Sequence, residues 1–242
     1  MSYQLYGAPD SANIVVQMVL EQLGVRYELC WVDRSSAEQR SVHYRQNLNP
    51  QGLLPVLVDG ETVLFETAAI ALHLTDKHRM LAPQVPGSAA RSRFLQWLFY
   101  LSNTLHADLR VQFYPRRHVE DAVALEALLA GTRRRVAGHF QLLEAQLSKQ
   151  RGGPWFLGAE LSILDFYLGA LCRWSVLYPT GAALTAGRPA SLPCLRGLLS
   201  ELEQLPAVAN TMAAQKVAAP FFTQPSPPDM PLEQICARVA EP

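Results

Sequence analysis

The stretch Asn49-Pro50-Gln51-Gly52-Leu53-Leu54-Pro55-Val56-Leu57-Val58-Asp59-Gly60 decides the fold, together with Phe65-Glu66-Thr67-Ala68-Ala69-Ile70 just after it. It predicts a turn, a short strand, an Asp-Gly hairpin, a second strand over 62–64 and a helix start. Pro55 stands at the front of an apolar strand, where proline is normally excluded because it cannot donate to the ladder. A cis Leu54–Pro55 bond in a turn that exposes the Leu54 backbone would accommodate it.

Glu66 and Thr67 open the helix that follows the hairpin. A carboxylate, a hydroxyl and free backbone N–H groups converge there. This combination suits a peptide-like ligand that carries both an amine and a carboxylate. The alternative interpretation is an edge strand begun by a proline, followed by an ordinary capped helix.

The composition indicates a folded protein of one large or two modest domains. The 242 residues are 49% hydrophobic and 17% charged, which argues against disorder. Lys+Arg and Asp+Glu both number 21, and the zero net charge disfavours nucleic-acid and anionic membrane partners. The four cysteines form no Cys-x-x-Cys pair, so we expect reduced thiols and no metal site. Without a signal peptide or a long apolar run, we expect a cytoplasmic protein that does not span a membrane.

The first third of the chain alternates between strand and helix patterns. Strands are expected over 3–6 and 27–32, a helix over 13–23, and a weakly helical segment over 36–48. The hairpin and a helix over 66–78 follow. This βαβ-ββα order predicts an α+β thioredoxin-like domain over residues 1–80.

The rest of the chain has a helical pattern, which begins with one long helix expected over 91–111. Residues 81–90 have the composition of a linker, and 91–242 are expected to form an all-helical domain with a proline-rich tail from about residue 220. Ser162 and Asp165 have the spacing of a capping box, in which each side chain bonds the backbone N–H at the other position. The helix behind the box is apolar nearly all round, so we expect it at the centre of this domain.

Three pieces together resemble the cytosolic glutathione S-transferases: the segment from Leu54 to Thr67, the turn after the first strand, and the Ser162–Asp165 box. Some features resemble the beta- and theta-like bacterial members. The resemblance implies a thioredoxin-like domain joined to an all-helical domain. It also implies a homodimeric enzyme that activates the thiol of its co-substrate, glutathione. The thiol would attack a small hydrophobic electrophile or serve thiol-dependent reduction.

The resemblance also implies how glutathione would be held. The backbone of Leu54 would pair with the cysteinyl part of the ligand, while Glu66 and Thr67 would hold the γ-glutamyl amine and carboxylate. The glycine carboxylate would face Gln51 or an early basic residue. The implied glutathione-binding residues are Gln51, Leu54, Pro55, Glu66, Thr67 and Asn103.

The thiol-activating group would lie in the turn Tyr6-Gly7-Ala8-Pro9-Asp10-Ser11-Ala12-Asn13. Ser11 falls on the catalytic serine of delta- and theta-like members, and Asn13 is the second candidate. Ala12 occupies the position of the beta-like cysteine, so a mixed disulfide with glutathione is not available. A donor aimed at the sulfur would favour the thiolate, which is the nucleophile. The alternative is that Ser11 or Asn13 only caps the helix.

A third catalytic candidate, His106, is carried over from a beta-like Ser-Ser-Glu-Leu-His pattern whose histidine faces the active site. The alternative for His106 is a hydrogen-bonded histidine in the core. Aromatic and basic residues around it are expected to form the wall of the acceptor pocket, although aromatic residues at helical spacing also suit a core. The predicted wall residues are Tyr100, Arg110, Phe113, Tyr114, Trp174 and Tyr178.

Two other classes of function compete with the transferase interpretation. One is a non-enzymatic regulatory or interaction protein with the same fold, and the presence of Glu66, Thr67 and Ser11 disfavours it. The other is a glutaredoxin-like redox enzyme, which would need a cysteine that the chain lacks between Met1 and Leu29.

Overall fold

The computed structural model describes residues 2–178 and 188–229, which form two compact units. The first unit contains the described residues up to Met80, together with 205–218 and 227–229. The second contains the described residues of 81–204 and the segment 219–226.

The first unit is built on a four-stranded mixed sheet with the strand order β2-β1-β3-β4. Its strands are β1 (Tyr3–Gly7), β2 (Tyr27–Trp31), β3 (Val56–Asp59) and β4 (Thr62–Phe65). Strand β1 is parallel to β2 and antiparallel to β3, and β3 is antiparallel to β4. The helices are α1 (Asn13–Leu23), α2 (Val42–Asn47) and α3 (Thr67–His78), with a 3₁₀ turn at Glu38–Arg40. The predicted βαβ-ββα thioredoxin-like order is confirmed.

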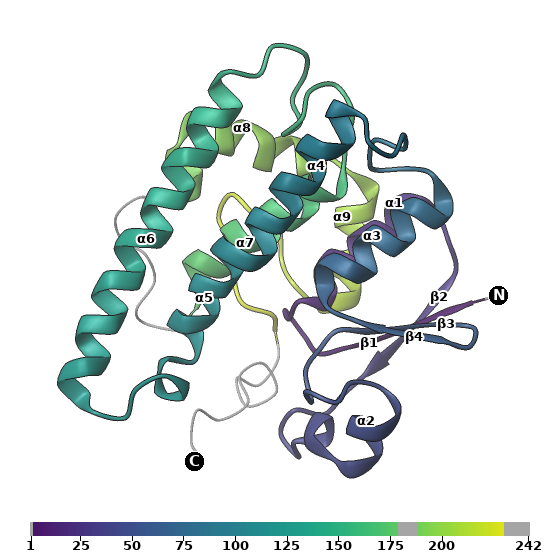
Figure 1. The fold of residues 1–242 in the computed structure, drawn as a ribbon, viewed down its shortest axis with the longest axis vertical. Helices are drawn as coiled ribbons and strands as arrows, with labels where there is room; N and C mark the ends of the chain where they lie inside the picture. The colour runs from purple at the N-terminus through teal and green to yellow at the C-terminus, as the bar shows by residue number, and fades with distance from the viewer. Residues whose placement is uncertain (1, 179–187, 230–242) are drawn as a thin grey trace. The chain divides into compact units, whose positions relative to one another are not determined.

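The sheet separates two apolar layers. Figure 1 shows α1 and α3 side by side on one face of the sheet and α2 on the other. The residues of α1 from Ile14 to Leu20 are buried and all but Gln17 are apolar, and Gly24 ends the helix in the left-handed conformation. On the α2 side, Tyr6 and Leu54 pack against a cluster that includes Tyr44. The alternation of β1 residues between buried and half-buried positions reflects these two faces.

Helix α9 (Pro206–Gln215) also belongs to the first unit, where it packs on α1. It lies in the part of the sequence for which a separate helical domain was expected. The local pattern of α9 gives only a helix, because its partners lie at the other end of the chain. One of these partners is Gln17, whose side chain accepts a hydrogen bond from Gln215.

The second unit is helical. Its α-helices are α4 (Ala89–Tyr100), α5 (His106–Phe113), α6 (Ala122–Ser148), α7 (Ile163–Leu177) and α8 (Pro193–Leu202). A π-helical segment, Leu101–Leu105, joins α4 to α5, and 3₁₀ turns lie at Pro115–Arg117 and Pro189–Ser191. In its described part, the β-structure is limited to one bridge between Trp155 and Gly158. The all-helical architecture is therefore confirmed, although the helix expected over 91–111 is two helices joined by a π segment.

Helix α7 is the centre of this unit, since every residue from Ile163 to Ser175 is buried. The predicted capping box is present at its start. Asp165 Oδ2 accepts hydrogen bonds from the backbone N–H of Ser162 at 2.8 Å and from the Ser162 hydroxyl at 2.9 Å. Its Oδ1 accepts the backbone N–H of Phe156 at 2.7 Å. Burial raises the pKa of Asp165 to about 6, against the opposing effect of these donors.

The start of the proline-rich tail packs against α7 and α8. Phe221 and Phe222 are buried. The Arg173 guanidinium donates to the carbonyls of Phe221 at 2.9 Å and Ser226 at 2.7 Å. Glu203 Oε1 accepts the backbone N–H groups of Phe222 and Thr223, each at 2.7 Å. Two buried or half-buried charged groups thus hold this segment, while the predicted tail beyond residue 229 lies outside the described residues.

Candidate functional site

The turn before β3 leaves a stretch of backbone without partners. The Leu54–Pro55 peptide bond is cis. The neighbouring Leu53 carbonyl accepts hydrogen bonds from the Tyr44 hydroxyl and from Asn49 Nδ2, each at 3.0 Å. Within the described residues, the N–H and C=O of half-buried Leu54 form no hydrogen bond. An extended peptide could therefore pair with Leu54 as an added strand does.

Asn49 and Gly52 give this turn its shape. Asn49 Oδ1 accepts the backbone N–H of Gln51 at 3.0 Å, and the Asn49 carbonyl accepts that of Gly52 at 2.9 Å. Gly52 has a φ of +65°, and an added Cβ would lie 2.8 Å from the Gln39 carbonyl oxygen, so only glycine fits. Gln51 Nε2 donates to Glu66 Oε1 at 3.3 Å. Two predicted ligand residues, one from the turn and one from α3, are thus brought together.

Helix α3 begins in an unusual way. Glu66, its N-cap residue, has φ 73° and ψ 113°, and its side chain makes no capping hydrogen bond. A non-glycine residue in this region costs about 1 kcal/mol or more, and such strain concentrates at functional sites. Thr67 is buried, and its hydroxyl has no hydrogen-bond partner among the described residues. An exposed carboxylate, a hydroxyl and the open first turn of the helix therefore meet at one place.

The turn after β1 is organised by Asn13. Its Oδ1 accepts the Ala8 backbone N–H at 3.2 Å and the Ser11 hydroxyl at 2.5 Å. Since the Ala8 N–H can only donate, this pair fixes which amide atom faces the turn. Asn13 is fully buried, and its Nδ2 has no partner in the described part of the chain. An added Cβ on Gly7 would lie 2.4 Å from Asn13 Cγ, so the glycine makes room for this side chain.

Ser11 and Asn13 therefore differ in what they can offer a ligand. Ser11 is half-buried and its hydroxyl donates to Asn13, whereas Asn13 is fully buried. Neither side chain caps α1, whose N-cap residue is Ala12 and has no side-chain capping bond. The capping alternative is wrong for both residues, since Asn13 is the first residue of the helix itself.

Two predicted site residues, Asn103 and His106, belong to the second unit. His106 Nδ1 lies 2.8 Å from the Tyr167 hydroxyl, and its ring stacks on Trp174 with centroids 5.4 Å apart. Burial, and to a smaller extent the charge of Arg110, lowers the pKa of His106 to about 4. The ring is therefore neutral at pH 7. These contacts are those of a hydrogen-bonded core histidine, and they leave Nε2 as its second polar atom.

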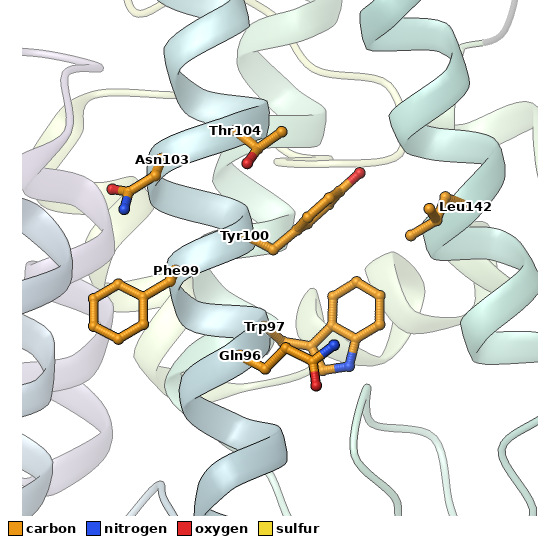
Figure 2. Close-up of a pocket in the computed structure, with 7 residues that line it drawn as sticks. All are labelled: Gln96, Trp97, Phe99, Tyr100, Asn103, Thr104 and Leu142. Atoms are coloured by element: carbon orange, nitrogen blue, oxygen red, sulfur yellow. The ribbon is translucent and has the colours of Figure 1, made fainter.

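A pocket of about 460 Å³ lies between α4 and α6. Figure 2 shows Tyr100 pointing from α4 toward Leu142 of α6, whereas Phe99 and Asn103 lie on the other side of α4. The lining residues are Gln96, Trp97, Phe99, Tyr100, Asn103, Thr104 and Leu142. Of the predicted acceptor wall, this pocket contains Tyr100. Among the predicted glutathione contacts, it contains Asn103.

Sequence reasoning missed the partners of Tyr100. Its hydroxyl lies 2.6 Å from His139 Nδ1, and His139 Nε2 lies 2.9 Å from Asp108 Oδ2. Arg135 Nε also donates to Asp108 Oδ2, at 2.8 Å. Asp108, His139 and Arg135 are spread over α5 and α6, and no motif marks them as one group.

The remaining predicted wall residues lie elsewhere in the second unit. Phe113 packs edge-on against Tyr178 and Tyr114, with centroids 6.0 Å and 6.4 Å apart. Trp174 is buried against His106, and Arg110 is exposed. The aromatic residues thus pack on one another, as in the core interpretation of their spacing.

Comparison with known proteins gives consistent matches for both units. The N-terminal domain of the glutathione S-transferases matches residues 1–76, and their C-terminal domain matches residues 126–205. Glutathione S-transferase F10 of Arabidopsis thaliana is 31% identical over 166 residues, which cover 65% of this chain and 74% of the relative. The chain belongs to the glutathione S-transferase family.

Other members of this family match nearly the whole chain. Glutathione S-transferase 3 of Zea mays is 26% identical over 228 residues, covering 93% of this chain and 96% of the relative. A glutathione transferase homologue from Sulfitobacter, solved with bound glutathione, has a TM-score of 0.74 at 24% identity. That match covers 88% of this chain and 98% of the solved one. Family and fold support glutathione transferase activity in general, whereas the beta- or theta-like bacterial subtype stays a prediction.

Over 2–178 and 188–229, no group of three or more His, Cys, Asp or Glu side chains could hold a metal ion. Within the same residues, no helix is both long and apolar enough to cross a membrane.

Proposed function

We propose that this family member binds reduced glutathione on its first unit and activates the thiol. The activated thiol attacks a small hydrophobic electrophile or serves thiol-dependent reduction. The observation that carries the proposal is the presence of two features together. Among the described residues, the backbone of Leu54 forms no hydrogen bond, and the first turn of α3 at Glu66 and Thr67 is open. The Sulfitobacter homologue, which was solved with bound glutathione, supports the same ligand here.

Each part of glutathione has a counterpart in this site. The cysteinyl backbone pairs with Leu54 beside Pro55, because that edge has unused donor and acceptor groups. The γ-glutamyl amine meets the Glu66 carboxylate, and the γ-glutamyl carboxylate meets Thr67 and the first-turn N–H groups of α3. Gln51 is bonded to Glu66 and therefore lies at the γ-glutamyl end, so the glycine carboxylate at the opposite end of the ligand falls to an early basic residue, Arg34 or Arg40.

Ser11 is the thiol contact in this proposal, and Asn13 orients it. The Ser11 hydroxyl has one proton, which it donates to Asn13 Oδ1 in the free protein. On binding, the hydroxyl turns toward the sulfur, because a hydrogen bond to a thiolate is worth about 1.5–3 kcal/mol against about 1 kcal/mol for a neutral one. That preference for the charged form lowers the thiol pKa.

His106 and Asn103 of the second unit are kept as proposed site residues on the family resemblance alone. His106 is neutral at pH 7, and its Nε2 is the polar atom that its bond to Tyr167 leaves for a ligand. The enzyme is proposed to act as a cytoplasmic homodimer, as the family resemblance implies. A sedimentation mass near 26.8 kDa at micromolar protein would contradict the dimer.

The test of binding is a calorimetric titration of reduced glutathione into the whole chain. We expect saturable binding of one ligand per chain, and Glu66→Ala should weaken it about tenfold or more, since a charged hydrogen bond is lost. Glu61→Ala, which removes an exposed carboxylate from the nearby hairpin, is the matched control and should leave the affinity unchanged. Absence of saturation at millimolar glutathione would contradict the proposal and favour a non-enzymatic interaction protein of the same fold.

The test of the thiol contact is the thiolate absorbance of bound glutathione as a function of pH. Ser11→Ala should raise the bound thiol pKa by about one unit, because the donor to the thiolate is gone. Ser36→Ala, an exposed serine in a loop of the same unit, is the control. An unchanged titration in Ser11→Ala would remove Ser11 from this role.

A further inference from the structure

The turn that carries Ser11 is attached to the far end of the chain by a buried hydrogen bond. The backbone N–H of Asp10 donates to Gln215 Oε1 at 3.0 Å, across 205 positions of sequence. Asp10 and Gln215 are both buried. A buried backbone N–H needs an acceptor, and here α9 supplies it through a side chain.

Behind this bond, a series of side-chain hydrogen bonds continues from α9 to α1. Gln215 Nε2 donates to Gln17 Oε1 at 2.6 Å, and Gln17 Nε2 donates to the Tyr27 hydroxyl at 3.0 Å. Tyr27 in turn donates to Glu21 Oε1 at 2.5 Å. Gln215, Gln17 and Tyr27 each accept one hydrogen bond of this series and donate the next.

The two ends of this series of hydrogen bonds fix its direction. The Asp10 N–H can only donate, and the Glu21 carboxylate can only accept. Both glutamine amides between them therefore have a single orientation, with Gln215 Oε1 toward the turn. Burial and the hydrogen bond to Glu21 raise the pKa of Tyr27 well above its ordinary value, so the phenol keeps its proton and remains a donor.

The geometry of the turn shows why this anchor acts on Ser11. Asp10 has a φ of 48°, in the left-handed region, and directly precedes Ser11. The other anchor of the turn is Asn13, which accepts hydrogen bonds from Ala8 and Ser11. With Asn13 holding both flanks and Gln215 holding Asp10, the backbone that aims the Ser11 hydroxyl is fixed from inside the turn and from α9.

We infer that Gln215 is a positioning residue for glutathione activation: through the Asp10 N–H it holds the turn in the conformation that presents Ser11 Oγ to the thiol. This inference rests on the proposed function of Ser11. A pair of buried glutamines between two helices is costly unless every polar atom is used. Here the oxygen and the nitrogen of each amide both form hydrogen bonds, and the bond at one end of the series goes to the turn rather than to another helix residue.

The test compares substitutions within α9 of the 242-residue chain. Gln215→Met keeps the size of the side chain but leaves the Asp10 N–H without its acceptor. Gln215→Asn is shorter and serves as a second variant, should Gln215→Met fold poorly. Gln215→Glu keeps an acceptor for Asp10 and, when its buried carboxyl is protonated, also keeps a donor for Gln17 Oε1, so it is the conservative rescue and is measured at acidic pH as well as at pH 7. Thr211→Ala is the matched control, since Thr211 is buried in α9 but bonds only the Ala207 carbonyl.

The readouts are the thiol pKa of bound glutathione and the glutathione affinity. Gln215→Met and Gln215→Asn should raise that thiol pKa by about one unit, as Ser11→Ala does, while the affinity changes less than about threefold. Gln215→Glu should stay near wild type. Thr211→Ala should lower the melting temperature without moving the thiol pKa.

The outcomes separate this inference from the proposed function. If wild type lowers the thiol pKa and the Gln215 variants do so equally well, the positioning role is overturned and the proposed function stands. If the thiol pKa rises equally in Thr211→Ala, the effect is a general loss of stability and the inference fails. If wild type binds no glutathione, or leaves its thiol pKa unchanged, the proposed function and the inference fall together.

Discussion

The first turn of helix α7 is closed by its own side chains, whereas the first turn of helix α3 is open. At α7, Asp165 accepts three hydrogen bonds from Ser162 and Phe156, and the carboxylate is fully buried. At α3, Glu66 is exposed, has a positive φ and caps nothing. Both helices begin with a hydroxyl residue and an acidic residue close together. The pair at α7 caps its helix, whereas the pair at α3 does not.

The difference separates polar groups that the fold uses from polar groups that it leaves for a ligand. A capping box satisfies orphan backbone donors and so contributes to stability. An open first turn beside a strained residue contributes nothing to stability, and the structure retains it at a cost. Removing the two acidic residues should therefore have opposite consequences, on stability at α7 and on binding at α3.

The largest effect is expected from Asp165→Asn. The amide keeps one acceptor oxygen but turns an NH₂ group toward backbone donors, so at least one charge-assisted hydrogen bond is lost. We expect the free energy of unfolding to fall by about 3 kcal/mol in chemical denaturation. Glu160→Gln, at an exposed position nearby, should change it by less than about 0.5 kcal/mol. If Asp165→Asn were as stable as wild type, Asp165 would not stabilise the fold, and in this respect it would not differ from Glu66 at α3.

A second effect concerns the pH dependence of stability in the same unit. The pKa of His106 is lowered to about 4, so between pH 4 and its ordinary value near 6.5 the unfolded chain binds more protons than the folded one. The free energy of unfolding therefore falls as the pH falls through this window. His106→Gln removes this contribution, and relative to the variant, wild type should lose about 2 kcal/mol between pH 7 and pH 5.

The raised pKa of Asp165 acts in the opposite direction. Between its ordinary value near 3.8 and about 6, the folded chain binds more protons at this group, so its contribution to stability grows as the pH falls. The difference between wild type and His106→Gln, measured by denaturation at several pH values, isolates the histidine. A difference that does not change with pH would contradict the neutral, half-buried ring.

The smallest effect on stability is expected at α3. Glu66→Ala and Glu66→Gly should both weaken glutathione binding about tenfold. Glu66→Gly should also raise the free energy of unfolding by up to about 1 kcal/mol, because glycine adopts a positive φ without steric cost. Calorimetry and denaturation of the same two proteins check this. If both variants were less stable than wild type by more than about 1 kcal/mol, Glu66 would be a structural residue like Asp165.

Local sequence patterns predicted the parts of the fold that depend on neighbours in sequence. The Asp59–Gly60 hairpin, the end of α1 at Gly24 and the Ser162–Asp165 box all rest on turn or capping chemistry within a few residues. The proposed glutathione segment rests on the same kind of local pattern, since Gln51, Leu54 and Glu66 lie on one hairpin and its flanks, and its role stays a prediction.

The parts that escaped prediction depend on distant partners. The packing of α9 on α1, the clamp of Arg173 on the tail and the Tyr100–His139–Asp108 group each join separate segments. The break of the long helix at Leu101–Leu105 was also missed, because a π segment has no composition of its own. The sequence indicated Asn13 as a candidate site residue. Its inward orientation could not be predicted, since it depends on the space left by Gly7.

The attachment of α9 to the first unit has a consequence for how the protein is made. The residues up to Met80 emerge from the ribosome long before Gln215 is synthesised. Until then the Asp10 N–H and the Gln17 amide lack the partners that they have in the finished chain. The turn that carries Ser11 therefore acquires its final support only after Gln215 has been synthesised, and a chain that stops before Gln215 would contain every proposed glutathione contact of the first unit without that support.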